Sequence, residues 1–384
     1  MSVKKNKICI IRRAYYPIES HVRRNAETLF ENGFIVNVIC MNEGGKKKFE
    51  VINGVNVYRL PIKARRNNIL IYIFEYFSFF LFAFVKLNIL SFKNRYNIIE
   101  TDSMPDFIVF ISFIQKLLGT KIILYLFESM PELWLQKRKI TERNLSYKFL
   151  CSVEKRSCSF ADNIICCHDM AKEVLVNRGI NAEKITVVLN VPDNKIFNNQ
   201  FYHNKTNSRT LRLVQHGTIT ENYGIQVVLQ ALAEINGKVP IHYDIIGCGE
   251  FRPYLERLVK KLKIGDLVTF HGFVSQENLL CLLNKANIGI VPMLFEYQSP
   301  NKMFELIALD KPIIISDRKT FLQYFDDEEV FYFKTGDSND LAKIILSIYN
   351  NSNLENKICK ARKKYKEYCW EKTKFTYVTL YELL

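Results

Sequence analysis

The segment 297–316, YQSPNKMFELIALDKPIIIS, combines a turn, a helix-length amphipathic stretch and a short apolar run. Glu305 follows the turn 299–302 and lies near the expected helix start. One interpretation is structural: Ser299 or Asn301 caps the helix, and the Glu305 carboxylate suits the positive end of the helix dipole. The other is that the turn and the helix start bind an anion, with Glu305 holding a polar ligand beside it. The segment alone favours the structural interpretation.

Short apolar runs alternate with helix-length segments along almost the whole chain. The runs of the first half are KICIIRR (7–13), IVNVICM (35–41), VNVYRLP (55–61), NIIET (97–101), KIILYLF (121–127), NIICC (163–167) and ITVVLN (185–190). Those of the second half are LRLVQHG (211–217), HYDIIG (242–247), VTFHGF (268–273), IGIVP (288–292), PIIIS (312–316) and VFYF (330–333). Helical patterns fill most of the gaps, as at 21–32, 105–118, 224–235 and 250–262. Continuous apolar strands separated by helices predict parallel sheets covered on both faces.

The polar, turn-rich stretch at 190–210 divides the two halves and predicts a linker. We therefore expect two Rossmann-like, doubly wound α/β domains that face each other across a cleft, with ligands at the carboxyl ends of the strands. The expected boundaries are 1–192 for the first domain, 193–208 for the linker and 209–365 for the second domain. The remaining segment, 366–384, is expected to be a helix that returns to the first domain.

The composition indicates which partners the chain can have and in which compartment it acts. Its 384 residues suit two domains, and its net charge of +15 suggests nucleic acid, anionic lipid or phosphorylated substrates as partners. A biased genome is an alternative source of that charge. The ten cysteines lack the spacing of a zinc site and several lie in apolar runs, which predicts free thiols in a reducing cytoplasm. The N-terminus has no apolar core of signal-peptide length.

The segment 69–90, ILIYIFEYFSFFLFAFVKLNIL, is long enough to cross a bilayer. A span would separate the first three strands from their sheet partners, and Glu75 and Lys86 lie within the segment. Three interpretations remain, namely a helix docked on a membrane surface, an ordinary core helix and a span. We favour the helix that packs partly on the sheet and partly on the membrane surface.

Several loops that follow strands carry polar residues or glycines. The first strand ends in RRAYYPIESHVRRNAETL without a G-x-G-x-x-G pattern, so His21, Arg23 and Arg24 are either solvated or part of a cleft. In the second half, VQHGTITENYGI, IIGCGEFRPYL and FHGFVSQENL each place glycine between a strand and a helix. Together with the turn 299–302, these loops would surround one cleft with backbone N–H groups able to hold a base, a ribose and a diphosphate.

At this point the chain resembles the family 4 glycosyltransferases, which have the GT-B fold and transfer sugars from nucleotide sugars with retention. The resemblance covers nearly the full length through SHVRRNAETLFENGFIVNVIC, NGVNVYRLPI, MPDFIVFISFIQKLLGTKIILYLFESMPELW, ITVVLNVPDNKIF and SPNKMFELIALDKPIIISD. It implies a bacterial enzyme that builds surface polysaccharides, such as capsule or O-antigen, or glycolipids. The last segment is the most specific of the five.

The resemblance assigns donor-binding roles to residues of the second domain. It implies that Glu305 accepts hydrogen bonds from the donor ribose, for which a carboxylate has acceptor sites and no competing donor. The positions it places around the diphosphate and the base are Ser299, Pro300, Asn301, Lys302, Gly217, Thr218, Tyr223, Gly249, Glu250, Phe273 and Val274.

The sequence departs from the family pattern at several catalytic positions. Where relatives have a Glu that reads the donor sugar, this chain has Tyr297, with Glu296 one place away. Thr218 and Tyr223 stand where relatives have Arg and Lys, a loss for which Lys302, Arg12 or Arg13 could compensate. A His-Asp pair of relatives reads Phe127 and Glu128, although His21 could face the same cleft. The candidate catalytic residues are therefore Glu296, Tyr297, Lys302, His21 and Glu128.

The resemblance further implies a mechanism without cofactor or metal, in which the donor's own phosphate oxygen takes the acceptor proton. The acceptor would be a saccharide or a lipid-linked oligosaccharide at the inner face of the cytoplasmic membrane. A degenerate relative that binds a nucleotide sugar or a partner enzyme without transfer is the main alternative. Nucleic-acid binding is a weak one, because the basic residues form no recognisable module.

Overall fold

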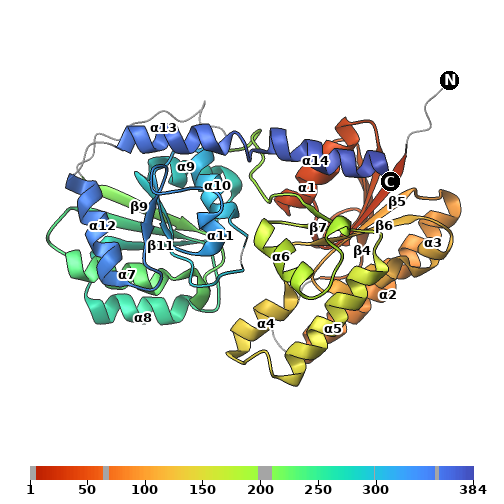
Figure 1. Cartoon of the computed structure of the whole chain (residues 1–384), viewed down its shortest axis with the longest axis horizontal. Coiled ribbons are helices and arrows are strands. Elements are labelled where there is room, and N and C mark those ends of the chain that lie inside the picture. Colours follow the sequence, from red (N-terminus) through yellow and green to blue (C-terminus); the bar gives the residue numbers. More distant parts are fainter. Residues whose placement is uncertain (1–5, 64–68, 198–209, 298, 351–353) are drawn as a thin grey trace. The chain divides into compact units, whose positions relative to one another are not determined.

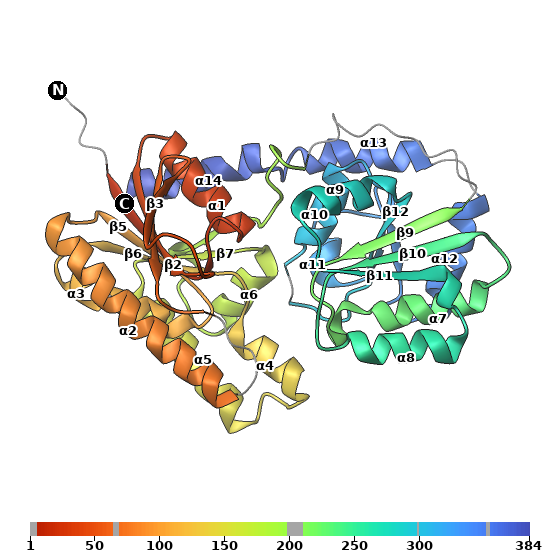
Figure 2. The same cartoon turned by 180° about the vertical axis from the view of Figure 1, so that it is seen from behind.

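The computed structural model describes residues 6–63, 69–197, 210–297, 299–350 and 354–384, without the side chains of Ile69, Leu70 and Tyr72. Most of the predicted linker, from residue 198 to 208, lies outside these residues. Contacts divide the chain into two compact units. Unit 1 comprises Met1–Asn190 and Thr373–Leu384, and unit 2 comprises Val191–Lys372. Figures 1 and 2 show each unit as a sheet with helices on both faces.

Unit 1 is built on an eight-stranded sheet with the order β3-β4-β2-β1-β5-β6-β7-β8. Its strands are β1 (Lys7–Tyr15), β2 (Ile35–Met41), β3 (Phe49–Ile52), β4 (Val55–Leu60), β5 (Ile98–Asp102), β6 (Lys121–Leu126), β7 (Asn163–Cys166) and β8 (Ile185–Val187). All paired strands are parallel except β3 and β4. The pattern of buried apolar runs thus produced the expected parallel sheet.

The strand β3, which forms an antiparallel hairpin with β4, was not predicted from the sequence, whereas β4 corresponds to the predicted strand 55–61. Asn53 and Gly54 form its turn with φ of 47° and 81°. A two-residue Asn-Gly turn with both φ values positive matches the twist of a hairpin. The Asn-Gly pair was therefore a readable signal for β3.

The helices of unit 1 cover both faces of this sheet. They are α1 (Ser20–Glu31), α2 (Ile69–Lys93), η1 (Asp106–Ser112), α3 (Phe113–Leu117), α4 (Met130–Arg138), α5 (Leu145–Phe160), α6 (Asp169–Asn177), η2 (Ala182–Lys184) and most of α14 (Trp370–Leu383). The single helix expected at 105–118 is instead the 3₁₀-helix η1 followed by the short α3. Aromatic and β-branched residues dominate DFIVFIS, and they favour the α-helix less than unbranched residues do.

The two faces of the unit 1 sheet carry different cores. On one face, Phe79 of α2, Ile108 of η1 and Cys158 of α5 pack against alternate strand residues such as Ile99. On the other face, α14 covers Glu100, and Figure 2 shows α2 and α14 on opposite sides of the sheet. Because successive strand side chains point to opposite faces, neighbours in β5 meet different helices.

Helix α14 brings the end of the chain into unit 1. Tyr377 and Tyr381 are fully buried, and both donate hydrogen bonds to the Glu100 carboxylate, at 3.1 Å for Tyr377. Burial raises the pKa of Glu100 to about 7, against the lowering effect of the two phenols. The last helix is therefore joined to β5 by a buried polar contact as well as by apolar packing.

Unit 2 contains a six-stranded, fully parallel sheet with the order β11-β10-β9-β12-β13-β14. Its strands are β9 (Leu211–His216), β10 (Ile241–Ile246), β11 (Val268–Gly272), β12 (Ile288–Val291), β13 (Ile313–Ser316) and β14 (Phe331–Phe333). Its helices are η4 (Glu221–Tyr223), α7 (Ile225–Ile235), α8 (Arg252–Leu262), η5 (Gly265–Leu267), α9 (Gln276–Lys285), α10 (Asn301–Ala308), α11 (Lys319–Leu322), α12 (Ser338–Asn350) and α13 (Leu354–Tyr365). Figure 1 shows α7, α8 and α12 on one face of this sheet and α9, α10 and α13 on the other.

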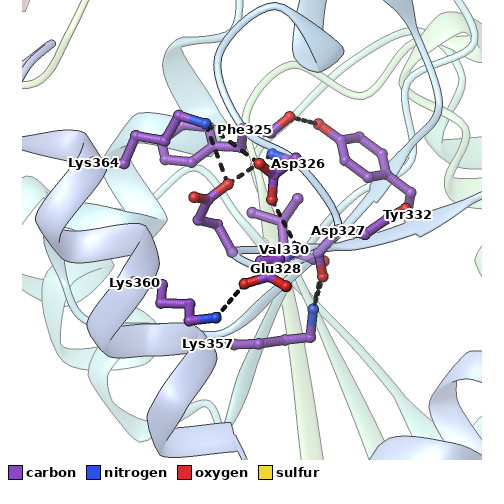
Figure 3. A network of polar contacts seen from close by, with 10 residues as sticks. Phe325, Asp326, Asp327, Glu328, Val330, Tyr332, Lys357, Lys360 and Lys364 are labelled. Carbon is purple, nitrogen blue, oxygen red and sulfur yellow. Dashed lines mark hydrogen bonds and ion pairs between the residues drawn. The ribbon is translucent and has the colours of Figure 1, made fainter.

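Helix α13 supports α10 and is itself fixed to an acidic turn. Its lysines meet the turn 326–329, where the Lys364 ammonium lies 3.4 Å from Glu329 and Lys360 pairs with Glu328 (Figure 3). At its end, the Tyr365 ring lies 6.2 Å from the ring of Phe304, a buried residue of α10. The aromatic contact fixes the helix that carries Glu305.

Candidate functional site

Three glycine loops meet at the carboxyl ends of β9, β10 and β11. The Gly217 N–H donates to the Ile246 carbonyl at 3.0 Å, and the Gly247 N–H donates to the Gly272 carbonyl at 2.8 Å. A Cβ on Gly247, at a φ of 133°, would overlap the carbonyl of Gly217. Only glycine permits this approach of two backbones, so the loops form a continuous surface of main chain.

The helix α10 begins beside these loops. It starts at Asn301, whose side-chain oxygen accepts from the Lys302 N–H at 2.9 Å. Pro300 occupies the capping position without a side-chain hydrogen bond, and the buried Ser299 hydroxyl has no partner among the described residues. Glu305 is the fifth residue of α10 and lies beyond its first turn. The purely structural interpretation of Glu305 as a first-turn acid is therefore wrong.

Glu305 is held between two side chains. His216, the last residue of β9, donates from Nε2 to Glu305 Oε2 at 2.5 Å, and Lys302 Nζ lies 3.5 Å from Oε1. Burial alone would raise the pKa of Glu305, but the Lys302 ammonium and the His216 hydrogen bond lower it to about 2. The carboxylate is thus ionised and able to accept hydrogen bonds at neutral pH.

His216 acts on Glu305 as a neutral group. Burial lowers the pKa of the imidazole and outweighs the raising effect of Glu305. The contact is therefore a hydrogen bond from a neutral ring to a carboxylate rather than an ion pair. His216 was not among the site residues predicted from the sequence. Its place at the end of a strand, directly before Gly217, was the signal that could have identified it.

Lys302 brings Gly217 and Tyr223 into the same site. A Cβ on Gly217 would lie 3.1 Å from Lys302 Cε and 3.8 Å from a ring carbon of Tyr223. The two side chains line a small pocket with Gln215 and His216. Four of the predicted donor-binding residues, Gly217, Tyr223, Lys302 and Glu305, are therefore brought together in unit 2.

The remaining donor-binding candidates lie on the neighbouring loops. The backbone beside Gly249 lies against the Gly217 loop, since the Ile219 N–H donates to the Cys248 carbonyl at 2.9 Å. The exposed candidates are Thr218, Glu250 and Phe273, and Val274 is half-buried. Phe273 has 83% of its surface exposed, which leaves its ring available to a ligand.

Among the described residues, no interaction joins Glu296 or Tyr297 to Glu305. The Glu296 carboxylate lies 3.3 Å from Arg318 and accepts from the Thr320 N–H at 3.3 Å. The half-buried Tyr297 ring packs on the edge of Phe295 at 5.7 Å. Glu296 is therefore already paired, and Tyr297 is the less constrained candidate of the two.

In unit 1, His21 and Glu128 gather around an arginine and an aromatic ring. The His21 ring lies 4.0 Å from the ring of Phe127, and the Arg12 guanidinium lies 4.6 Å from the same ring. His21 Nδ1 is 3.3 Å from Glu19. Burial raises the pKa of Glu128, and Arg12 partly offsets that effect. The carboxyl end of the unit 1 sheet thus presents a mixed acidic and basic cluster.

Arg13 is engaged elsewhere. Its guanidinium lies 2.5 Å from Glu75 of α2 and donates to the Tyr76 hydroxyl at 3.1 Å. Because Glu75 neutralises it, Arg13 is a poor source of the positive charge that Thr218 and Tyr223 lack. Within the described part of the chain, no group of three or more His, Cys, Asp and Glu side chains is arranged to hold a metal ion.

Comparison with known proteins covers both units. The family model for glycosyltransferase family 4 matches residues 18–193, and that for glycosyl transferases group 1 matches residues 197–365. An uncharacterised glycosyltransferase of Methanocaldococcus jannaschii is 26% identical over 340 residues, which are 81% of this chain and 80% of that protein. The amylovoran biosynthesis glycosyltransferase AmsK of Erwinia amylovora is 24% identical over 181 residues, 45% of this chain and 44% of that protein.

A solved structure resembles the whole fold. The Anabaena protein HepE in complex with UDP-glucose has a TM-score of 0.72 at 13% identity, over 98% of this chain and 100% of that chain. The two parallel-sheet units have the GT-B architecture of such enzymes. The two family matches, which follow one another along the chain, show that this protein is a glycosyltransferase of the group 1 and family 4 type.

Proposed function

We propose that this glycosyltransferase moves a sugar, with retention, from a nucleoside-diphosphate sugar to an acceptor of the cell envelope. The observation that carries the proposal is the ionised Glu305 beside Lys302 at the glycine loops. A carboxylate with no proton accepts hydrogen bonds from two ribose hydroxyls, and an adjacent ammonium attracts a diphosphate. The ribose and the diphosphate of a nucleotide sugar thus each have a matching group in this site.

The other residues of the site take supporting roles in this proposal. The backbone of Gly217 and the turn 299–301 approach the diphosphate, with the unpartnered Ser299 hydroxyl as a further donor. The exposed Phe273 ring stacks on the base, beside Val274, with Gly249 and Glu250 near it. Tyr297, with the adjacent Glu296 as the alternative, contacts the donor sugar.

Retention is proposed through the donor's own phosphate oxygen, which takes the acceptor proton on the face from which the leaving group departs. The protein then contributes position and charge rather than a proton relay, and Lys302 stabilises the diphosphate as its negative charge develops. This route uses no metal. His21 and Glu128 of unit 1 are proposed to contact the acceptor.

A lipid-linked oligosaccharide or a polysaccharide is the acceptor class that we propose. The name of AmsK assigns that relative to the biosynthesis of a polysaccharide, amylovoran. The enzyme would act at the inner face of the cytoplasmic membrane, where such acceptors and nucleotide sugars are both accessible. HepE was solved with UDP-glucose, so uridine nucleotides are the first donors to test.

The test is a thermal-shift panel of nucleoside diphosphates and their sugars, since a ligand that binds only the folded state raises its apparent stability. We expect one nucleotide to raise the melting temperature. Glu305→Ala should abolish that shift, whereas Glu277→Gln, on the exposed face of α9, should retain it. Glu305→Gln keeps an oxygen that can accept from His216, so this variant should remain folded. A smaller thermal shift in it would therefore report a weaker ribose contact rather than a loss of fold.

An unchanged shift in a folded Glu305→Ala protein would exclude the ribose role. Turnover is measured separately as release of nucleoside diphosphate in the presence of cell-envelope extract. Donor binding without release for any donor would overturn the transfer of a sugar to such an acceptor.

A further inference from the structure

One helical layer of unit 1 has an unusual outer surface. We call α2, η1, α3 and α5 together the helical layer. They cover one face of the sheet, with η1 in contact with both α2 and α5 (Figures 1 and 2). Their inward side chains, such as Phe79, Ala83 and Leu87 of α2, are fully buried in the sheet core. Helix α2 therefore lies along the unit with its opposite side outward.

The outward side of α2 is apolar along its whole length. Phe74, Phe77, Leu81, Val85, Ile89 and Phe92 follow one another at spacings of three or four residues, and all are exposed. The exposed fraction is 71% for Phe74, 64% for Phe77 and 96% for Phe92. A contiguous apolar surface of this kind marks an interaction site rather than a solvated face. Phe113 and Leu117 of α3 extend it.

The charges of the helical layer are sorted by sign. Its acids are Glu75, Asp106 and Glu154, and all three are buried. Its basic residues, which are all half-buried or exposed, are Lys86, Lys93, Lys116, Lys148, Lys155 and Arg156. An ordinary amphipathic helix places charges of both signs outward. Here the charged groups of the outer surface are all positive.

The wider distribution of charge agrees with this sorting. Unit 1 has 30 Lys and Arg against 18 Asp and Glu, whereas unit 2 has 24 against 21. The excess positive charge of the protein is thus concentrated in the unit that carries the helical layer. A partner with negative charge and an apolar interior fits both features.

A hollow lined by residues of η1 and α5 adds polar and cationic side chains to this surface. It has a volume of about 600 Å³ and is lined by Phe110, Ser152, Lys155, Arg156, Ser159 and Phe160. A lining of two cationic side chains, two hydroxyls and two aromatic rings suits a phosphate attached to an apolar group. The aromatic contact between Phe113 and Phe160, with ring centroids 6.3 Å apart, connects the hollow to α3.

We propose that the helical layer docks this enzyme on a bilayer that contains anionic lipids, with the apolar side of α2 at the acyl boundary and a lipid phosphate in the hollow at Lys155 and Arg156. A second copy of the chain fits less well, because a two-fold contact would set the basic residues against their equals. A span is excluded by the burial of Phe79, Ala83 and Leu87 in the sheet. The inference names the surface by which the proposed function reaches its acceptor, and it rests on that function.

The test is flotation of the purified full chain with vesicles of phosphatidylcholine alone or mixed with phosphatidylglycerol. We expect binding to the mixed vesicles only, weakened by salt. The double substitution Lys155→Glu/Arg156→Glu should reduce binding by roughly tenfold or more, since it reverses two charges near the anionic surface. Phe82 of α2 is also exposed, to 45%, and Phe77→Ser/Phe82→Ser should reduce binding by a comparable factor through lost apolar contact.

Matched controls lie outside the helical layer. Phe375 of α14 is 66% exposed, so Phe375→Ser should leave vesicle binding unchanged, as should Lys260→Glu/Lys261→Glu on α8. Equal binding to both vesicle types, or equal loss in test and control variants, would overturn the inference. So would a dimer in solution that the Phe77→Ser/Phe82→Ser variant dissolves.

Donor binding separates this inference from the proposed function. The donor residues lie in unit 2, so the layer variants should keep the nucleotide-induced thermal shift of the unchanged protein. A retained shift without vesicle binding in the unchanged protein refutes the docking surface alone. Vesicle binding without any nucleotide shift refutes the proposed function and leaves the surface in place.

Discussion

The pair of His216 and Glu305 shows how a single strand-end residue controls a buried carboxylate. Glu305 has 15% of its side chain exposed, so its ionised form needs partners, and Lys302 and His216 supply them. Removing either partner leaves a buried charge less well compensated, which costs more than the mean value of a hydrogen bond. The position and the ionised state of Glu305 therefore depend on β9 as much as on α10.

We predict that His216→Leu raises the pKa of Glu305 and weakens nucleotide binding by roughly tenfold, because a hydrogen bond to a charged group contributes about 1.5–3 kcal/mol. In the unchanged protein Glu305 stays ionised down to a pH near its pKa of about 2. The variant should instead lose binding as the pH falls through the acidic range, since a protonated Glu305 accepts less well. Titration calorimetry at several pH values measures both effects.

His216→Gln is the matched control, because its amide can donate from about the same position as Nε2. It should restore much of the affinity and the flat pH profile. If His216→Leu weakened binding equally at every pH, the ring would act only by filling space.

The sequence predicted most of the residues that meet at the candidate site of unit 2, but not how they pair. Gly217, Tyr223, Lys302 and Glu305 were proposed from the resemblance and from turn patterns, and the structure brings them together. His216 was missed, because no spacing rule relates a residue at the end of β9 to one in α10 that lies far along the chain. Likewise, the pairing of Glu296 with Arg318 depends on tertiary packing.

At the scale of elements, the hydrophobic runs predicted the sheets well, since parallel strands are buried on both faces and read as continuous apolar runs. Two elements were not predicted correctly. The strand β3 (FEVI) pairs only with β4 and contains no buried residue, so its four residues do not form the longer apolar run that marks a strand buried on both faces. The segment that forms η1 and α3 has a helical pattern, but its first part is a 3₁₀-helix rich in aromatic and β-branched residues, and it contacts both α2 and α5.

The contact between β5 and α14 makes the stability of unit 1 depend on pH. The folded state raises the pKa of Glu100 from 4.5 to about 7, so it binds a proton that the unfolded chain has released between these values. The stabilisation that Glu100 contributes is therefore complete below about pH 4.5. It falls by about 1.4 kcal/mol per pH unit as the pH rises from there and is lost once the pH passes 7. We predict that Glu100→Gln makes unit 1 more stable at pH 8 and flattens this dependence.

Urea denaturation at pH 5.5 and pH 8 measures the effect. Glu43→Gln, at an exposed position of unit 1, is the control and should keep the dependence of the unchanged protein. A Glu100→Gln protein that is less stable at both pH values would show that the carboxylate is ionised in the folded state.

For the whole molecule, two separate cores imply two unfolding transitions. Each unit has its own sheet and its own buried cluster. Since multidomain proteins commonly unfold in steps, calorimetry should resolve a transition for each unit. A nucleotide bound at Glu305 should raise the transition of unit 2.

We predict that truncation after Lys372 lowers the melting transition of unit 1 and leaves that of unit 2 in place. The truncation removes the fully buried Tyr377 and Tyr381 and exposes the face of β5 that carries Glu100. The nucleotide-induced shift serves as the internal control for unit 2. An equal loss in both transitions would contradict the assignment of α14 to unit 1.

The return of α14 to the first sheet also sets an order of events at the ribosome. Residues Val191–Lys372 are synthesised before Thr373–Leu384, so unit 2 can complete its fold while unit 1 still lacks its final helix. Nascent chains stalled just short of that helix would expose the Glu100 side of an unfinished sheet to chaperones and proteases. For this enzyme, the half that begins translation is therefore the last to be finished.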